Sequence, residues 1–267
     1  MGELAEALLL LGLLLGSSYT GLYCRRWMRE HHRSRDTIDS VRLVIAILVT
    51  FAALVLGLLV TSVKSDFDAH TAAVRRLGIQ LTELDARLRE YGPQAEPIRR
   101  LVRQYTAAAI ATTWPDEPAP KGDYPLHLTQ VTPESLESEQ LTEMLTRADA
   151  MVQQLTPANG FQTRVASLAQ SAMQATLQAR WAVIESASPT ISRPFLSLLM
   201  FWLVVIFTVF GLTSPPNGVI QAVVVLAALS LASSLYLILD LDTPLSGFMT
   251  VSSQPLRDAL RHMDRPT

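Results

Sequence analysis

Two aspartates close the last apolar stretch of the chain, where they could hold a turn or a gate. Asp240 and Asp242 end this stretch, and Pro244 and Gly247 follow at the spacing Asp-x-Pro-x-x-Gly. An aspartate can accept hydrogen bonds from its own backbone, and glycine is free to adopt a positive φ. The spacing therefore predicts a tight, rigid turn. The simpler interpretation is that the acids only mark the edge of a membrane.

Two further groups of side chains are candidates for contact with ions or lipid. Small and hydroxyl residues share the last apolar stretch, and we expect them to line a pore or to pack helices together: Ser230, Ala232, Ser233 and Ser234. Hydroxyl groups inside membranes more often join helices than line a path. Arg25, Arg26 and Arg29 follow the first apolar stretch, where lipid phosphate is the nearest anion.

Residue patterns typical of catalysis are missing from the sequence. His31 and His32 lack a glutamate at the spacing of a zinc-protease helix, and there is no glycine-rich phosphate loop and no nucleophile elbow. The single cysteine, Cys24, excludes a disulfide scaffold and a thiolate zinc site. We therefore expect no enzyme activity, no cofactor and no metal site. No tail is basic enough to indicate nucleic-acid binding.

The elements that would position these residues are four apolar stretches, each about long enough to cross a bilayer. They cover residues 4–24, 43–63, 195–212 and 219–239, and none carries a charge in its central part. A soluble helix rarely stays apolar on every face over such a length. The sequence predicts an integral membrane protein with four transmembrane helices. The lack of intramembrane charge disfavours a proton-coupled transporter but allows a passive pore.

The predicted organisation is two transmembrane hairpins around a soluble helical domain. Residues 1–63 form the first hairpin with its arginine-rich loop, residues 64–194 the soluble domain, residues 195–241 the second hairpin, and residues 242–267 a turn and a short helix. We find no strand-like alternation of useful length, so the fold class is all-α.

Heptad spacing predicts that the second span continues into the soluble domain as one helix over residues 43–91. A seam of core positions supports this, and Gly92 and Pro93 end the helix: Phe67, His70, Val74, Leu77, Leu81, Leu84, Leu88 and Tyr91. The seam could form a coiled coil between copies or pack against the other helices of its own chain.

Three more helices are expected in the soluble domain. The first covers residues 97–113, and the second starts at Thr132 and Pro133. The third covers residues 159–187, with these side chains facing inward: Phe161, Val165, Leu168, Ala172, Trp181 and Ile184.

Charge predicts the orientation in the membrane only in part. Six arginines face three acids between the first two spans, which favours a cytoplasmic loop there and an external soluble domain. Other basic residues lie near the opposite span ends, among them Lys64, Arg75 and Arg193.

Several short motifs, in this order, resemble the bestrophin-like membrane protein family of bacteria and plants. They are Tyr91-Gly92-Pro93, Phe201-Trp202, Phe210-Gly211-Leu212, Pro216-x-Gly218 around Asn217, and the turn from Asp242 to Gly247, and the resemblance covers residues 42–260.

The resemblance implies a pentameric anion channel with four spans per subunit and a helical domain in the cytosol, opposite to the side that charge favours. Leu245 stands where the bestrophin turn usually has an aromatic residue, and no acidic run follows Gly247. A calcium site of the bestrophin kind is therefore not supported.

Two functions follow from these patterns. The first is a homo-oligomeric passive ion channel in the bilayer of a bacterial inner membrane, for which the resemblance implies selectivity for anions. The second is a non-catalytic sensor or scaffold that acts through an unidentified protein partner. A helical bundle between spans two and three is typical of extracytoplasmic sensor domains, but no kinase or methyl-accepting region follows it.

Overall fold

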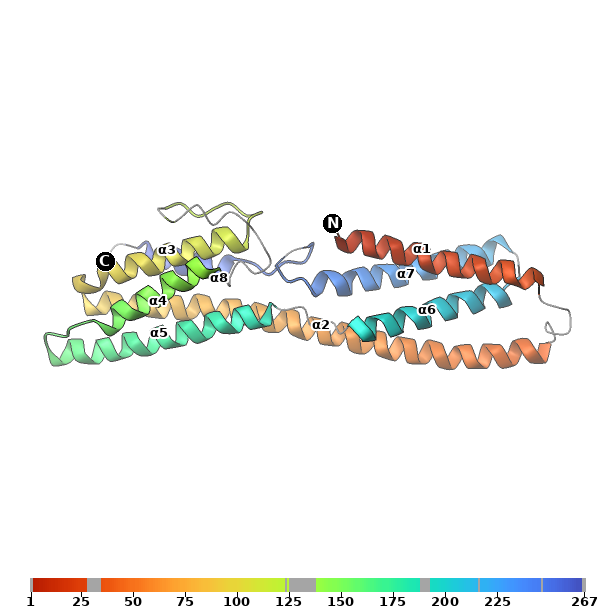
Figure 1. Ribbon diagram of the computed structural model, residues 1–267, viewed down its shortest axis with the longest axis horizontal. Helices are drawn as coiled ribbons and strands as arrows, with labels where there is room; N and C mark the ends of the chain where they lie inside the picture. The colour runs from red at the N-terminus through yellow and green to blue at the C-terminus, as the bar shows by residue number, and fades with distance from the viewer. Residues whose placement is uncertain are drawn as a thin grey trace. The chain divides into compact units, whose positions relative to one another are not determined.

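The computed structural model describes residues 2–27, 35–122, 124, 138–187, 193–215, 217–245 and 247–265. Every regular element in these ranges is a helix (Figure 1). In chain order they are α1 (Gly2–Cys24), η1 (Arg25–Trp27), α2 (Arg35–Tyr91), η3 (Pro93–Ala95), α3 (Glu96–Thr113), α4 (Glu139–Gln153), α5 (Gly160–Ser186), α6 (Arg193–Thr213), α7 (Gly218–Leu241) and α8 (Gln254–Met263). The all-helical prediction is confirmed for this part of the chain.

The chain divides into two compact units. Unit 1 comprises Met1–Asp66 and Pro189–Met249, and unit 2 comprises Phe67–Ser188 and Thr250–Thr267. The long helix α2 contributes its first half to unit 1 and its second half to unit 2. Four helices in the described residues, α1, α2, α6 and α7, are long and apolar enough to cross a membrane.

Close backbone contact joins α1 and α6 in unit 1. A Cβ added at Gly21 would overlap the backbone carbonyl of Thr208, and a Cβ added at Gly211 would overlap that of Ser18. Each glycine therefore lies directly against the backbone of the other helix. Small residues allow this approach in membranes, where apolar packing against lipid gives no preference for association. α7 packs on the same helix, α1, and buries Ala228 and Ala232.

The core of unit 2 is built on the heptad seam of α2. Seven of the eight seam residues, from His70 to Tyr91, are buried within the single chain. Intramolecular packing thus accounts for the seam. Gly92 follows with φ of 111°, a conformation that glycine adopts readily, and Pro93 begins η3. The predicted helix end at Tyr91 is confirmed, whereas the helix starts earlier than predicted, at Arg35.

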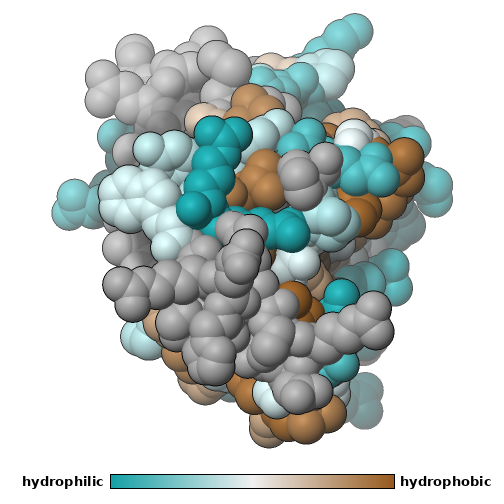
Figure 2. Space-filling view, turned by 90° about the vertical axis from the view of Figure 1, so that its right-hand side faces the viewer, coloured by the Kyte–Doolittle hydropathy of each residue, from teal (hydrophilic) through white to brown (hydrophobic). Residues whose placement is uncertain are grey.

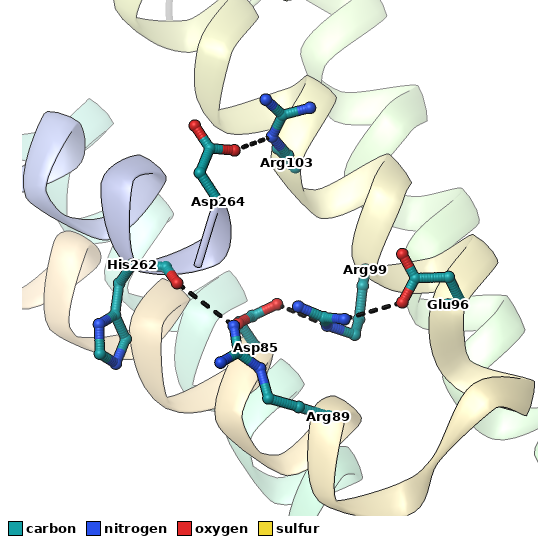
Figure 3. Close-up of polar contacts among 7 residues, drawn as sticks. All are labelled: Asp85, Arg89, Glu96, Arg99, Arg103, His262 and Asp264. Carbon is teal, nitrogen blue, oxygen red and sulfur yellow. Dashed lines mark hydrogen bonds and ion pairs between the residues drawn. The ribbon is translucent and has the colours of Figure 1, made fainter. Parts of the chain in front are cut away.

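A buried carboxylate ties α2 to α3 and α8 in unit 2 (Figure 3). Asp85 accepts hydrogen bonds from Arg99 Nε at 2.9 Å and from Arg89 Nη2 at 3.1 Å. Arg89 also donates to the backbone carbonyl of His262 at 3.2 Å, at the end of α8. Arg103 of α3 pairs with Asp264 just beyond α8. Two arginines thus compensate the buried charge of Asp85, and Arg89 and Arg103 join α2 and α3 to the end of α8.

The segment that leads into α8 is fixed by the end of α3. Trp114 Nε1 donates to the carbonyl of Val251 at 2.6 Å, and Arg257 Nε donates to Glu117 at 3.0 Å. Burial raises the pKa of Glu117, but the hydrogen bonds from Ser253 and Arg257 outweigh it and lower the pKa. Glu117 is thus held as a carboxylate that binds α8.

Arg180 of α5 lies in the interior of unit 2, where only 2% of it is exposed. Its guanidinium donates to Thr142 Oγ1 of α4 at 2.7 Å. Nearby, burial raises the pKa of Tyr105 to about 12, although the charge of Arg180 acts in the opposite direction. A polar contact thus lies among the packed apolar side chains of α3, α4 and α5.

The inward face predicted for the helix over residues 159–187 is partly wrong. Phe161, Leu168 and Trp181 are exposed in unit 2. Alanines fill much of the buried face instead, including Ala169 and Ala179. Small side chains let neighbouring helices approach closely, so the large ones turn outward. Asn159 caps the start of α5, with its side chain accepting from Gln162 N at 2.8 Å.

The predicted helix start at Thr132 and Pro133 lies outside the described residues. In the described part, Ser138 caps α4, and its hydroxyl accepts from Leu141 N at 3.2 Å.

We predict that Gly21→Ala destabilises unit 1, because the added methyl group must push α1 away from α6. Overpacking of this kind costs about 1–3 kcal/mol. Gly16→Ala in the same helix is the matched control, since nothing lies within 4 Å of a Cβ at Gly16. Titration with sodium dodecyl sulfate, followed by tryptophan fluorescence, measures both variants. Equal stability of the two variants would contradict the close crossing.

Candidate functional site

The turn after α7 is organised around the carboxylate of Asp240. The two carboxylate oxygens accept one hydrogen bond each, from Phe248 N and from Met249 N, both at 2.8 Å. Asp240 is only 1% exposed. A buried carboxylate needs such partners because the loss of hydration is otherwise costly. The chain thus folds back on the last turn of the apolar helix within unit 1.

Local sequence explains why α7 stops and the turn forms here. Asp242 occupies the C-cap position, and its amide donates to the carbonyls of Asp240 and Ile238. Pro244 lacks an amide hydrogen and cannot donate the next backbone hydrogen bond of the helix. Gly247 has φ of 110°, which places the next two amides within reach of Asp240. A turn thus follows α7 in the described residues, whereas residue 246 of the predicted Asp-x-Pro-x-x-Gly turn lies outside them, so the complete tight turn stays a prediction.

The residue that holds the turn differs from the one singled out by the Asp-x-Pro-x-x-Gly spacing. Asp240, two residues before this motif, accepts from the amides, whereas Asp242 caps the helix through its own backbone. The available signal was an acid at the end of an apolar helix with no basic residue nearby in sequence. Phe248 and Met249, which sequence reasoning missed, supply the amides.

The small-residue group on α7 is divided between two sides of the helix. Ala232 is 5% exposed and packs inside unit 1, whereas Ser230 and Ser233 are exposed. The serine hydroxyls donate to carbonyls one turn earlier: Ser230 to Leu226 at 2.9 Å, Ser233 to Leu229 at 2.8 Å, and Ser234 to Ser230 at 2.9 Å. The group therefore combines one packing residue, Ala232, with serines whose hydroxyl groups donate to the backbone of their own helix.

The arginines after α1 also take different positions. The guanidinium of Arg25 donates to the carbonyl of Ser214, just beyond the end of α6. A cation there interacts favourably with the helix dipole. Arg26 is exposed, and Arg29 lies outside the described residues. Figure 2 looks at this end of unit 1 and shows hydrophilic surface at its centre and hydrophobic surface along its lower and right-hand edges.

The part of the chain that the structure describes contains no candidate metal site. No group of three or more His, Cys, Asp or Glu side chains lies together there as a metal site would require. Both oxygens of Asp240 are already engaged by amides. The arrangement acts as a structural clamp at the end of an apolar helix.

These features define a class: a helical membrane protein whose apolar unit ends in a clamped turn. A family model described as the Bestrophin-like domain matches residues 11–256. The chain therefore belongs to the Bestrophin-like family, as the sequence motifs predicted. Fold and apolar helices together support an integral membrane protein.

Solved structures share this fold over nearly the full length of both chains. Two crystal structures of point variants of a bacterial bestrophin homologue from Klebsiella pneumoniae match with TM-scores of 0.72 and 0.69 and identities of 13% and 14%. Coverage is 98% of this chain and 97% of the other chain in the first case, and 97% of each in the second. A structure described only as a membrane protein matches with a TM-score of 0.67, 13% identity and 97% coverage of each chain. No curated protein sequence matches.

We predict that Asp240→Asn loosens the turn without unfolding α7. Loss of the charge weakens two charge-assisted hydrogen bonds, each worth about 1.5–3 kcal/mol. The amides of Phe248 and Met249 should then exchange with deuterium roughly 10- to 100-fold faster, as measured by exchange mass spectrometry. Asp242→Asn is the matched control and should leave these two amides protected. Unchanged exchange in Asp240→Asn would contradict the clamp.

Proposed function

We propose that this protein is a passive anion channel, assembled from several copies of the chain in a bacterial inner membrane. The observation that carries this proposal is family membership over residues 11–256, because the characterised members of the family are anion channels. In this proposal unit 1 crosses the bilayer with four spans, and unit 2 forms the soluble part.

The character of the apolar helices supports passive conduction. Their central parts contain no Asp, Glu, Lys, Arg or His. Coupled transporters usually need such groups in the membrane to bind protons or ions. Passive pores can use hydroxyl groups, backbone groups and apolar constrictions instead. Diffusion down a gradient is thus the transport mode that fits these residues.

Packing within unit 1 supports a path between copies rather than through one copy. α1 and α6 touch at Gly21 and Gly211, and α7 buries Ala228 and Ala232. The cavity described between α1, α6 and α7 has a volume of about 30 Å³. A space of this size holds a single water molecule. A continuous ion path through these three helices would need far more room.

The exposed serines of α7 are the proposed polar positions along such a path. Ser230 and Ser233 lie on the same side of α7, away from Ala232. Ala7 of α1 is buried like Ala232, so a comparison of leucine substitutions at these two alanines would mix packing with conduction. Exposed positions provide a cleaner comparison.

We predict that purified protein in liposomes conducts halide faster than potassium, and that Ser233→Leu lowers halide flux several-fold. The larger apolar side chain would narrow the path and remove its hydroxyl group. Ala5→Leu is the matched control, because Ala5 is exposed on α1, a helix that carries none of the proposed path residues, and it should keep the flux. Halide efflux and potassium efflux from loaded liposomes measure both.

Halide efflux equal to that of protein-free liposomes, from protein shown to be folded, would contradict the channel. The non-conducting sensor or scaffold would then be the better proposal, with capture of its partner protein as the next experiment.

A further inference from the structure

The most exposed large apolar side chain described in unit 1 belongs to the clamped turn. Phe248 is 86% exposed, and its neighbour Met249 is 40% exposed. Single exposed apolar residues are common on protein surfaces. Phe248 and Met249 differ from such single residues, because they are adjacent on a turn whose backbone position is fixed.

Asp240 is what fixes them. Its buried carboxylate binds the backbone amides of both residues at 2.8 Å. Gly247, with φ of 110°, sets the direction in which the chain enters this pair. The backbone of Phe248 and Met249 is thus held against the end of α7, while both side chains remain exposed.

The length of α7 places this turn at the level of a bilayer surface. α7 has 24 residues, which span about 36 Å at the usual rise. The hydrocarbon core of a bilayer is about 30 Å thick. If α7 crosses the bilayer, the turn that directly follows it lies among the lipid headgroups.

The other end of unit 1 carries a similar exposed apolar group. Tyr19 and Tyr23 of α1 and Trp27 of η1, which directly follows α1, are exposed and four residues apart (Figure 1). Four-residue spacing places them on one face, and the rings of Tyr23 and Trp27 have centroids 6.1 Å apart. Aromatic residues collect at both surfaces of a bilayer. Exposed aromatic side chains therefore border unit 1 at both ends.

We propose that Phe248 and Met249 form an interfacial anchor that inserts into the headgroup region of the lipid bilayer, with Asp240 as the positioning residue. The anchor fixes the depth of α7 in the membrane. This inference depends on α7 crossing a bilayer and does not require that the protein conducts ions, so it can fail or hold independently of the channel.

Spin labels in reconstituted full-length protein test the anchor. Cys24 is the only cysteine, so Cys24→Ser provides a background without reactive thiols. Met249→Cys places a label on the turn and retains Phe248. Leu226→Cys, at an exposed position within α7, is the hydrocarbon reference, and Arg164→Cys, at an exposed position of α5, is the aqueous reference. Collision with oxygen and with a nickel chelate reports the depth of each label.

We expect the label at residue 249 to lie between the two references, about 5–10 Å into the boundary of headgroups and acyl chains. Phe248→Ser and Asp240→Asn, each added to this background, should move the label toward the aqueous reference. Asp240→Asn should also increase the mobility of the label.

Three results would overturn the proposal. A label as accessible to nickel as that at residue 164 would place the turn in water. A label that neither probe reaches, with broadening from neighbouring labels, would show that a second copy covers the turn. A depth that Asp240→Asn and Phe248→Ser leave unchanged would remove the anchoring role from both residues.

Discussion

Direct backbone contact between two apolar helices is the constraint on which unit 1 depends. Gly21 and Gly211 each lie against a carbonyl of the opposite helix, so neither position has room for a Cβ. Lipid tails are as apolar as leucine, and close van der Waals contact must therefore supply much of the association in a membrane. The crossing brings the end of α1 near the end of α6, where Arg25 reaches the carbonyl of Ser214. α7 also packs on α1.

A second constraint acts where the apolar helix α7 ends. Asp240 is buried, and a carboxylate in that position is stable only when its oxygens are satisfied. Two consecutive amides, those of Phe248 and Met249, satisfy it and hold this part of the chain against the end of α7. Since the segment directly follows an apolar helix, the same clamp that completes the fold also exposes Phe248 at a fixed place. In the proposed anchor, the side chain of Asp240 would thus serve both the stability of the turn and its contact with the membrane.

The sequence predicted the features that rest on long patterns, because such patterns average over many residues. The apolar stretches, the buried seam from His70 to Tyr91 and the stop at Gly92 all follow from spacing alone. The sequence did not predict which of several neighbouring residues makes a given contact. The carboxylates of Asp240 and Asp242 are two residues apart, and only the path of the turn decides which one meets the amides. The large side chains of α5 misled in a similar way, because alanines allow closer helix packing than Phe161 or Trp181 would.

Anion passage is tested most directly by the reversal potential of the protein in a planar bilayer with unequal potassium chloride on the two sides. An anion-selective path predicts a current that reverses near the equilibrium potential of chloride, and replacing chloride by a large organic anion should abolish the current in one direction. A current that reverses near the potassium equilibrium potential, or no current from folded protein, would contradict passive anion conduction.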